Sequence, residues 1–396
     1  MTIESIADKN KVAIVTVGFN RVKSMQRLLE SLLKADYSKY PDVPLVISID
    51  CSGDEVLYKY VREFNWPYGK KYVRIQEKRL GLKEHILSCG DLTKYFKGVI
   101  LLEDDIFVTP NFYNYTVQAI DYYDNEPKIA SISLYNDEMN GFCWLPFSKL
   151  HKEADVYTFQ GVFSWGECWT ERMWGDFRKW MESTTIDWNA VDMPPQISQW
   201  TRAWSKFYHA YMVLNDLYSL CPYVSLTTNF SDAGEHGGDN NTIVQVNLQY
   251  GYKEYTFRPF DELVHYDAYS NNNDLYEHLQ LPKTELCVDL FGERDNRFNK
   301  RYYLSVKSLP YKVIRSFGLF LRPQELNVLY GIEGNDIFLY DTQEKGNKPR
   351  SKGMSNRLMY YLHGMGYGKG VINLYRVSWG QTKSLIRMAW KKYVVK

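Results

Sequence analysis

The chain has 396 residues, enough to bury a large core, and its length suggests two or three domains or one large domain with an accessory region. Its 48 Lys and Arg residues nearly balance its 47 Asp and Glu residues, so the formal net charge is only +1. This near balance excludes a global positive field that would steer the protein onto nucleic acid, and any basic patch must be local.

The cysteines and the first residues bear on the compartment. The six cysteines are widely spaced and include no C-x-x-C pair, so we expect reduced thiols rather than a disulfide framework or a zinc site. Residues 1–9 contain no apolar signal region, and no segment reaches about 18 continuous apolar residues. These patterns predict a cytoplasmic protein that neither spans a membrane nor is secreted by that route.

Short apolar runs alternate with segments of helical periodicity along the first third of the chain. We expect strands at residues 12–17, 45–49, 72–75, 99–102 and 129–133. Helical spacing of apolar side chains predicts helices over residues 22–33 and 54–64. Strands that alternate with helices indicate βαβ units and a mostly parallel sheet.

Acidic residues close two of these strands. The run 99–102 ends in Glu103, Asp104 and Asp105, and the run 45–49 ends in Asp50. Carboxylates at the carboxyl end of a parallel strand lie where open α/β sheets bind their ligands. They could hold a divalent cation against a nucleotide diphosphate, or they could form an ordinary solvated acidic loop.

The sequence lacks two glycine-rich motifs that bind phosphates in other proteins. A dinucleotide-binding domain needs G-x-G-x-x-G there, but Gly18 is followed by Phe19 and Asn20. No segment matches the P-loop pattern either. A metal ion held by acids is the other common way to neutralise a diphosphate.

Several motifs resemble one enzyme family. Residues 15–21 resemble the opening strand and turn of nucleotide-sugar-dependent glycosyltransferases of the GT-A fold. Residues 101–105 resemble the acidic metal motif of those enzymes, in the Glu-Asp-Asp form of Golgi N-acetylglucosaminyltransferases, and residues 109–112 resemble the segment after it. Residues 161–170 resemble the Ser-Trp-Gly-x-x-Trp segment that borders the acceptor site in bacterial family-two transferases of surface polysaccharide synthesis. A Trp-rich core turn is the alternative for this last segment.

The resemblance covers roughly residues 11–250 and implies both a fold and an activity. It implies an α/β GT-A catalytic domain over residues 1–260, with a mostly parallel central sheet between helices, followed by an α-rich accessory region over residues 261–396. It further implies transfer of a sugar from a nucleotide-diphosphate donor to a hydroxyl of a growing, lipid-linked bacterial surface glycan. The cofactor would be Mn²⁺ or Mg²⁺, and the outcome at the sugar carbon would be inverting.

The resemblance also assigns roles to individual residues. Asp105 would be the direct metal ligand, together with His236 from a late glycine-rich loop, and Asp104 would contact the ribose or the ion. His236 could equally be a structural loop histidine. The expected contacts to the nucleotide and the rest of the substrate are Thr16, Val17, Phe19, Asn20, Arg21, Asp50, Arg79, Glu103, Asp104, Trp165 and Gly166.

The sequence does not assign the general base that an inverting enzyme needs to a single residue. Related enzymes supply it after the Trp-rich segment, where this chain has Ser205 between Trp204 and Lys206. The remaining acids are Glu167, Asp187, Asp192, Asp232 and Glu235, and we expect Glu167, Asp104 and Glu235 to be the catalytic carboxylates. The unassigned base leaves open a non-catalytic protein of the same fold that binds nucleotide sugar or scaffolds a membrane assembly. A nucleotidyltransferase would need a G-x-x-x-R-L-type loop near the start, which the chain lacks.

The end of the chain predicts a basic amphipathic helix. Its apolar face would carry Leu385, Ile386, Ala389, Trp390 and Tyr393, with Lys383, Arg387 and Lys391 on another face. Such a helix can lie peripherally on the inner face of a membrane, near a lipid-linked acceptor, or it can pack on the catalytic domain.

Overall fold

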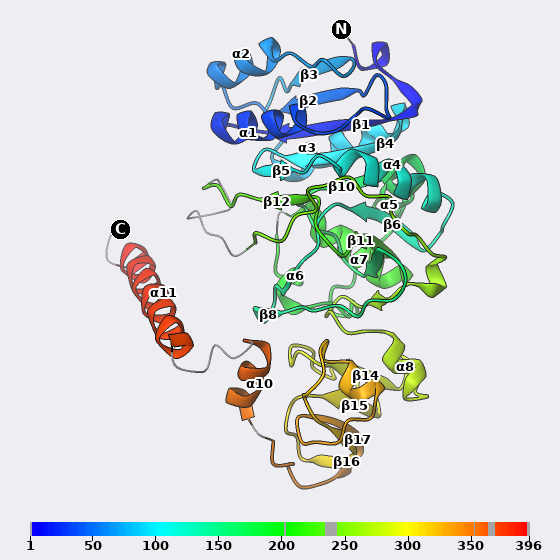
Figure 1. Ribbon diagram of the computed structural model, residues 1–396, viewed down its shortest axis with the longest axis vertical. Helices are drawn as coiled ribbons and strands as arrows, with labels where there is room; N and C mark the ends of the chain where they lie inside the picture. The colour runs from blue at the N-terminus through cyan, green and yellow to red at the C-terminus, as the bar shows by residue number, and fades with distance from the viewer. Residues whose placement is uncertain (1, 202, 234–243, 352, 363–368, 394–396) are drawn as a thin grey trace. The chain divides into compact units, whose positions relative to one another are not determined.

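The computed structural model describes residues 2–201, 203–233, 244–351, 353–362 and 369–393 (Figure 1). The chain forms two compact units. One comprises Met1–Phe142 and Lys149–Asp274, and the other comprises Cys143–Ser148 and Leu275–Lys396. The division therefore falls at residue 274, whereas the sequence suggested residue 260.

A nine-stranded sheet forms the centre of the first unit, in the order β13-β9-β11-β6-β10-β4-β1-β2-β3. Its strands are β1 (Asp8–Gly18), β2 (Leu45–Ile49), β3 (Lys71–Ile75), β4 (Phe96–Glu103), β6 (Ile129–Ser133), β9 (Val156–Phe159), β10 (Glu167–Thr170), β11 (Tyr218–Pro222) and β13 (His265–Tyr266). Strands β4, β1, β2 and β3 are parallel, and β10 runs antiparallel between β4 and β6. The predicted α/β class and mostly parallel sheet are confirmed. One edge of the sheet thus gathers the carboxyl ends of β1, β2, β4 and β6 and the amino end of β10.

Helices flank this sheet because each has an apolar face to bury. They are α1 (Val22–Leu33), α2 (Glu55–Glu63), α3 (Leu82–Gly90), α4 (Phe112–Tyr123), α5 (Glu171–Ser183), α6 (Pro195–Ser198) and α7 (Trp204–Asn215). In α1 the buried side chains Met25, Leu28 and Leu32 recur at helical spacing and join the core of the unit. The Asp54 carboxylate caps α2 by accepting the Leu57 N–H at 3.0 Å.

A short second sheet connects the acidic turn to a distant part of the chain. Strand β5 (Ile106–Val108) pairs antiparallel with β12 (Thr227–Asn229). The pairing continues into the next residue, since the Phe230 N–H donates to the Asp105 carbonyl at 2.9 Å. Residues 230–233 are therefore held beside the end of β4.

The second unit contains its own four-stranded sheet, ordered β14-β15-β17-β16. Its strands are β14 (Leu286–Asp289), β15 (Tyr302–Ser305), β16 (Tyr311–Phe317) and β17 (Ile337–Lys345), and its helices are α9 (Leu326–Leu329), α10 (Gly353–Tyr361) and α11 (Lys369–Tyr393), after α8 (Asp274–His278) at the boundary. The predicted α-rich C-terminal region is thus corrected, because residues 286–345 are built around a sheet. The cations interspersed in β16 obscured its strand character, and they are tolerated because β16 is an edge strand.

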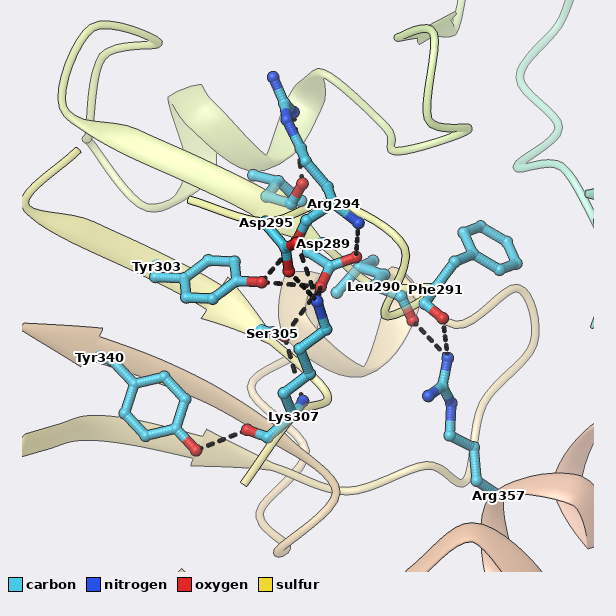
Figure 2. Close-up of polar contacts among 11 residues, drawn as sticks. Asp289, Leu290, Phe291, Arg294, Asp295, Tyr303, Ser305, Lys307, Tyr340 and Arg357 are labelled. Carbon is cyan, nitrogen blue, oxygen red and sulfur yellow. Dashed lines mark hydrogen bonds and ion pairs between the residues drawn. The ribbon is translucent and has the colours of Figure 1, made fainter. Parts of the chain in front are cut away.

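A buried carboxylate organises one corner of this second unit (Figure 2). Asp289 accepts hydrogen bonds from the Tyr303 hydroxyl at 2.9 Å, the Ser305 hydroxyl at 3.1 Å and the Arg294 N–H at 3.0 Å. The Lys307 ammonium lies 3.5 Å from the same carboxylate. The buried charge is therefore neutralised and hydrogen-bonded, and it ties the end of β14 to β15.

Two chain-wide observations complete the fold. All six cysteines have free thiols. Among the described residues, no helix combines the length and the apolar character needed to cross a bilayer.

Candidate functional site

Three carboxylates crowd together where β4 ends. Glu103 is the last residue of β4, and Asp104 and Asp105 form the turn into β5. Burial, together with the charges of Asp105 and Asp104, raises the pKa of Glu103. Burial also raises the pKa of Asp104 to about 6, although Arg21 opposes this change. A bound cation would relieve this repulsion between like charges.

Arg21 is the cation that faces these acids. It precedes α1, and its guanidinium pairs with Asp104 and, at 3.0 Å, with Asp105. Burial lowers the pKa of Arg21, but the two carboxylates outweigh burial and leave the pKa raised. Arg21 also donates to the Asp232 carbonyl at 3.2 Å, so one side chain links the acidic turn to the segment after β12.

The segment after β12 is anchored through Asp232 by two α1 residues, Ser24 and Arg27, to which the sequence assigned no role. The Asp232 carboxylate pairs with Arg27 and accepts the Ser24 hydroxyl at 2.7 Å, both from α1. The Arg27 guanidinium lies 3.9 Å from the centre of the Phe230 ring. Burial raises the pKa of Asp232, but Arg27 and Ser24 outweigh burial and lower the pKa overall. Asp232 is therefore an ion-paired anchor and a weak candidate for a general base.

A second group forms around Asp50, at the end of β2. Its carboxylate accepts backbone N–H groups of Cys51, Leu80 and Gly81 at 2.8, 2.9 and 2.9 Å. These bonds fix the loop that leads into α3 and carries Arg79. The Arg79 guanidinium lies 4.6 Å from the centre of the Phe19 ring, which belongs to the loop after β1. Three of the predicted donor contacts, Asp50, Arg79 and Phe19, are thus connected through one loop.

Three other predicted donor contacts differ in how accessible they are. Thr16 and Val17 are buried inside β1 between β2 and β4, so their side chains are not available to a ligand. Any contact of these two residues to a nucleotide would therefore be made through the backbone, and their expected role stays a prediction. Asn20, in contrast, is exposed in the loop between β1 and α1.

The Trp-rich segment meets the same edge of the sheet. The Trp165 ring lies 4.7 Å from the Tyr135 ring, and the Trp165 carbonyl accepts the Thr227 hydroxyl at 2.6 Å. Trp169, four residues later, is buried against Trp174 in the core. The core interpretation is therefore confirmed for Trp169, whereas the place of Trp165 beside an acceptor stays a prediction.

Glu167 is buried at the start of β10, opposite Leu101 of β4. One carboxylate oxygen accepts the Phe163 N–H at 3.0 Å, and the other has no hydrogen-bond partner among the described residues. Burial raises the pKa of Glu167 to about 8. A carboxylate with a pKa this close to neutral suits a general base, although the buried side chain also braces the turn of residues 163–166.

Replacing Gly166 by alanine is expected to destabilise the protein by about 2 kcal/mol. Gly166 has φ +112°, and an added Cβ would lie 3.0 Å from the Thr227 methyl group and 3.3 Å from the Leu134 Cβ. Urea unfolding measures the loss. The matched control is Gly175→Ala inside α5, where a Cβ meets no described atom within 4 Å and a gain of roughly 0.5–1 kcal/mol is expected. Equal effects of the two substitutions would contradict the strain at Gly166.

Several predicted residues contribute less or are not described. Glu235 and His236 lie outside the described residues. Asp187 is exposed and accepts the Asn189 N–H at 3.0 Å, which is a local turn contact. Trp204 is buried at the start of α7, so the segment around Ser205 begins a helix and provides no carboxylate.

The acidic turn offers two carboxylates, those of Asp104 and Asp105, to a divalent metal. Within the described part of the chain, no three His, Cys, Asp or Glu side chains converge as a ready-made metal site. Mn²⁺ or Mg²⁺ that is bound together with a diphosphate needs only one or two carboxylates, because phosphate and water oxygens complete its coordination. The crowded pair Asp104 and Asp105 meets this requirement.

Comparison with known proteins gave matches among solved structures only. No protein-family model and no curated protein matches the chain. Residues 1–349 of S. aureus TarS, in complex with UDP-GlcNAc, match with 16% identity over 57% of this chain and 60% of that chain, at a TM-score of 0.36. The mannosyltransferase PcManGT from Pyrobaculum calidifontis, in complex with GDP-Man and Mn²⁺, matches with 9% identity over 55% of this chain and 58% of that chain, at a TM-score of 0.33. GalNAc-T7 with UDP, GalNAc and Mn²⁺ matches with 16% identity over 55% of this chain and 43% of that chain, at a TM-score of 0.37.

These three solved chains are similar to part of this chain, at low sequence identity. The chain spans less than two thirds of each of the three solved chains.

Proposed function

We propose that the protein is a metal-dependent glycosyltransferase that uses a nucleoside-diphosphate sugar as donor. The observation that carries the proposal is that two groups of residues lie at the same edge of the parallel sheet. One is the acidic pair Asp104 and Asp105 with its cation Arg21, and the other is the Asp50 loop that holds Arg79 over Phe19. The first group suits a diphosphate with its metal, and the second suits a nucleoside.

The nucleoside half is supported by rigid positioning. The Phe19 ring and the Arg79 guanidinium are flat groups that can stack on a base, and Asp50 holds the loop between them. The exposed Asn20 offers a further donor and acceptor beside Phe19. We assign base and ribose recognition to these residues.

The diphosphate half is supported by charge. Asp104 and Asp105 would hold Mn²⁺ or Mg²⁺, which when bound would neutralise the diphosphate as it leaves the sugar. Arg21 lies within reach of the same carboxylates and can turn one of its nitrogens to a phosphate oxygen. Burial and the two neighbouring carboxylates raise the pKa of Glu103, so a bound cation would favour its ionised form.

The acceptor half rests on Glu167 and Trp165. We propose Glu167 as the general base that takes the proton of the acceptor hydroxyl, because its raised pKa lies near neutral pH. Glu235 is the second candidate for this role. Trp165 would border the acceptor, and the sequence resemblance supports a hydroxyl of a lipid-linked bacterial surface glycan, reached from the cytoplasm, with inversion at the sugar carbon.

Calorimetric titration of the full chain tests the donor site. UDP, GDP and CMP are each titrated with Mn²⁺ and, separately, with EDTA. We expect one diphosphate to bind at least about tenfold more tightly with Mn²⁺, because Asp105 would help to hold an ion that neutralises the diphosphate charge. Equal affinity in Mn²⁺ and in EDTA would overturn the proposed site.

A second experiment separates an enzyme from a binder. The buried position of Glu167 also fits a non-catalytic protein that binds nucleotide sugar, because an acceptor must displace the turn of residues 163–166 to reach it. Release of free nucleoside diphosphate from a panel of donor sugars is measured with and without the chain. Release above background supports the enzyme, and tight donor binding without any release supports the binder.

A further inference from the structure

The basic residues of the chain are concentrated at its end. After Glu344 the sequence contains 12 Lys and Arg residues and no Asp or Glu. The first 344 residues hold the remaining 36 basic and all 47 acidic residues, which gives them a net charge of −11. The near-neutral total therefore conceals an acidic body and a strongly basic tail.

The long helix of this tail exposes an apolar stripe. Val371, Ile372, Tyr375, Trp379 and Ile386 of α11 are each at least 50% exposed. At 100° per residue, these five positions fall within an arc of about 100° on the helix surface. The stripe is therefore an apolar face of the helix, interrupted by the exposed Thr382 between Trp379 and Ile386, and not a scatter of single exposed side chains.

Cations border the stripe. Arg376 and Lys383 are exposed and follow the apolar arc on one side, and the Lys383 ammonium lies 5.3 Å from the centre of the Trp379 ring. A tryptophan beside a lysine is the pairing that suits a lipid headgroup layer, where the ring is half buried and the ammonium stays in water.

We propose that α11 binds along the surface of an anionic lipid bilayer, with the stripe of Val371, Ile372, Tyr375, Trp379 and Ile386 among the upper acyl chains. Burial of the stripe favours binding, and attraction of the basic tail to anionic headgroups adds to it. The helix lies on the bilayer and does not cross it, because Arg376 and Lys383 interrupt its apolar character.

Charge also argues against two other partners. A second α11 would bring the same cations together, which disfavours pairing between copies. Nucleic acid would attract the cations but would leave the aliphatic stripe in water. An anionic membrane attracts the cations and also buries the apolar stripe. It repels the acidic first 344 residues, so contact is made through the basic tail.

Flotation of the full chain with lipid vesicles tests this inference. We expect binding to vesicles that contain phosphatidylglycerol, little binding to pure phosphatidylcholine, and weaker binding as salt is raised. The double substitution Ile372→Glu and Ile386→Glu should weaken binding at least about tenfold, because it removes apolar burial and adds two negative charges. The control Val56→Glu removes an exposed aliphatic side chain from α2 and should leave flotation unchanged.

The outcomes are separable from those for the donor site. Circular dichroism should show that both variants fold, and nucleotide titration should give the same affinity for both, since the proposal does not depend on the proposed reaction. No binding of the wild-type chain to anionic vesicles would overturn the inference. Equal binding to both kinds of vesicle, or equal losses in the α2 and α11 variants, would also overturn it.

Discussion

Asp105→Ala is expected to abolish the dependence of nucleoside-diphosphate binding on Mn²⁺ and to lower kcat/KM by at least about a thousandfold. The substitution removes one of the two carboxylates that would hold the ion, and Asp104 alone remains paired with Arg21. Calorimetry in Mn²⁺ and in EDTA measures the first effect, and donor turnover measures the second.

Two comparisons make the Asp105 experiment specific. Asp105→Asn keeps the shape of the side chain and removes its charge, so it should behave like Asp105→Ala if charge is what matters. Asp121→Ala removes an exposed carboxylate of α4 that pairs with Lys97, and it should change neither binding nor turnover. Metal-dependent binding of wild-type strength in Asp105→Ala would rule out the acidic turn as the metal site.

Glu167→Gln is expected to lower kcat by roughly a hundredfold to ten-thousandfold with little change in KM for the donor, because it removes the proposed base and keeps its shape. The base acts when deprotonated, so wild-type kcat should rise as pH increases through about 8. The residual kcat of the variant should lack this rise. A KM for the donor that increases with an unchanged kcat would contradict the assignment.

Stability gives an independent readout of the same carboxyl group. Its pKa in the folded protein, about 8, lies above the ordinary value of 4.5, so folding favours the protonated form. The stability that it contributes is fully present below pH 4.5 and is lost as pH rises through 8. Glu167→Gln should remove this loss, so the variant should gain stability relative to the wild type at high pH. Glu171→Gln, an exposed residue that pairs with Lys9, should not.

Local patterns were sufficient to predict five of the nine strands of the central sheet, β1, β2, β3, β4 and β6, and the acidic residues that close two of them. The strands that end in Asp50 and in Glu103 could be predicted because a buried strand has a distinctive run of apolar residues and because parallel strands end on one edge. The same patterns could not show that Thr16 is fully buried, since its burial depends on tertiary packing against the sheet.

Contacts between distant segments could not be predicted. The bond from Ser24 to Asp232 joins residues 208 positions apart, and it exists only because β12 pairs with β5. The sheet of the second unit was missed for a related reason, because strands as short as β14 carry little periodic signal. In both cases tertiary pairing decides the structure.

The position of Arg21 has a thermodynamic consequence. Its guanidinium contacts Asp104, Asp105 and the carbonyl of Asp232 together. A cation at the acidic turn would therefore compete with Arg21 for the two carboxylates, and Arg21 also restrains the chain after β12. The coupling between the two is reciprocal. If ion binding weakens the Arg21 restraint by a given free energy, then strengthening the restraint weakens ion binding by the same free energy. The affinity for an ion at the end of β4 and the order of the segment around Asp232 are therefore coupled through Arg21.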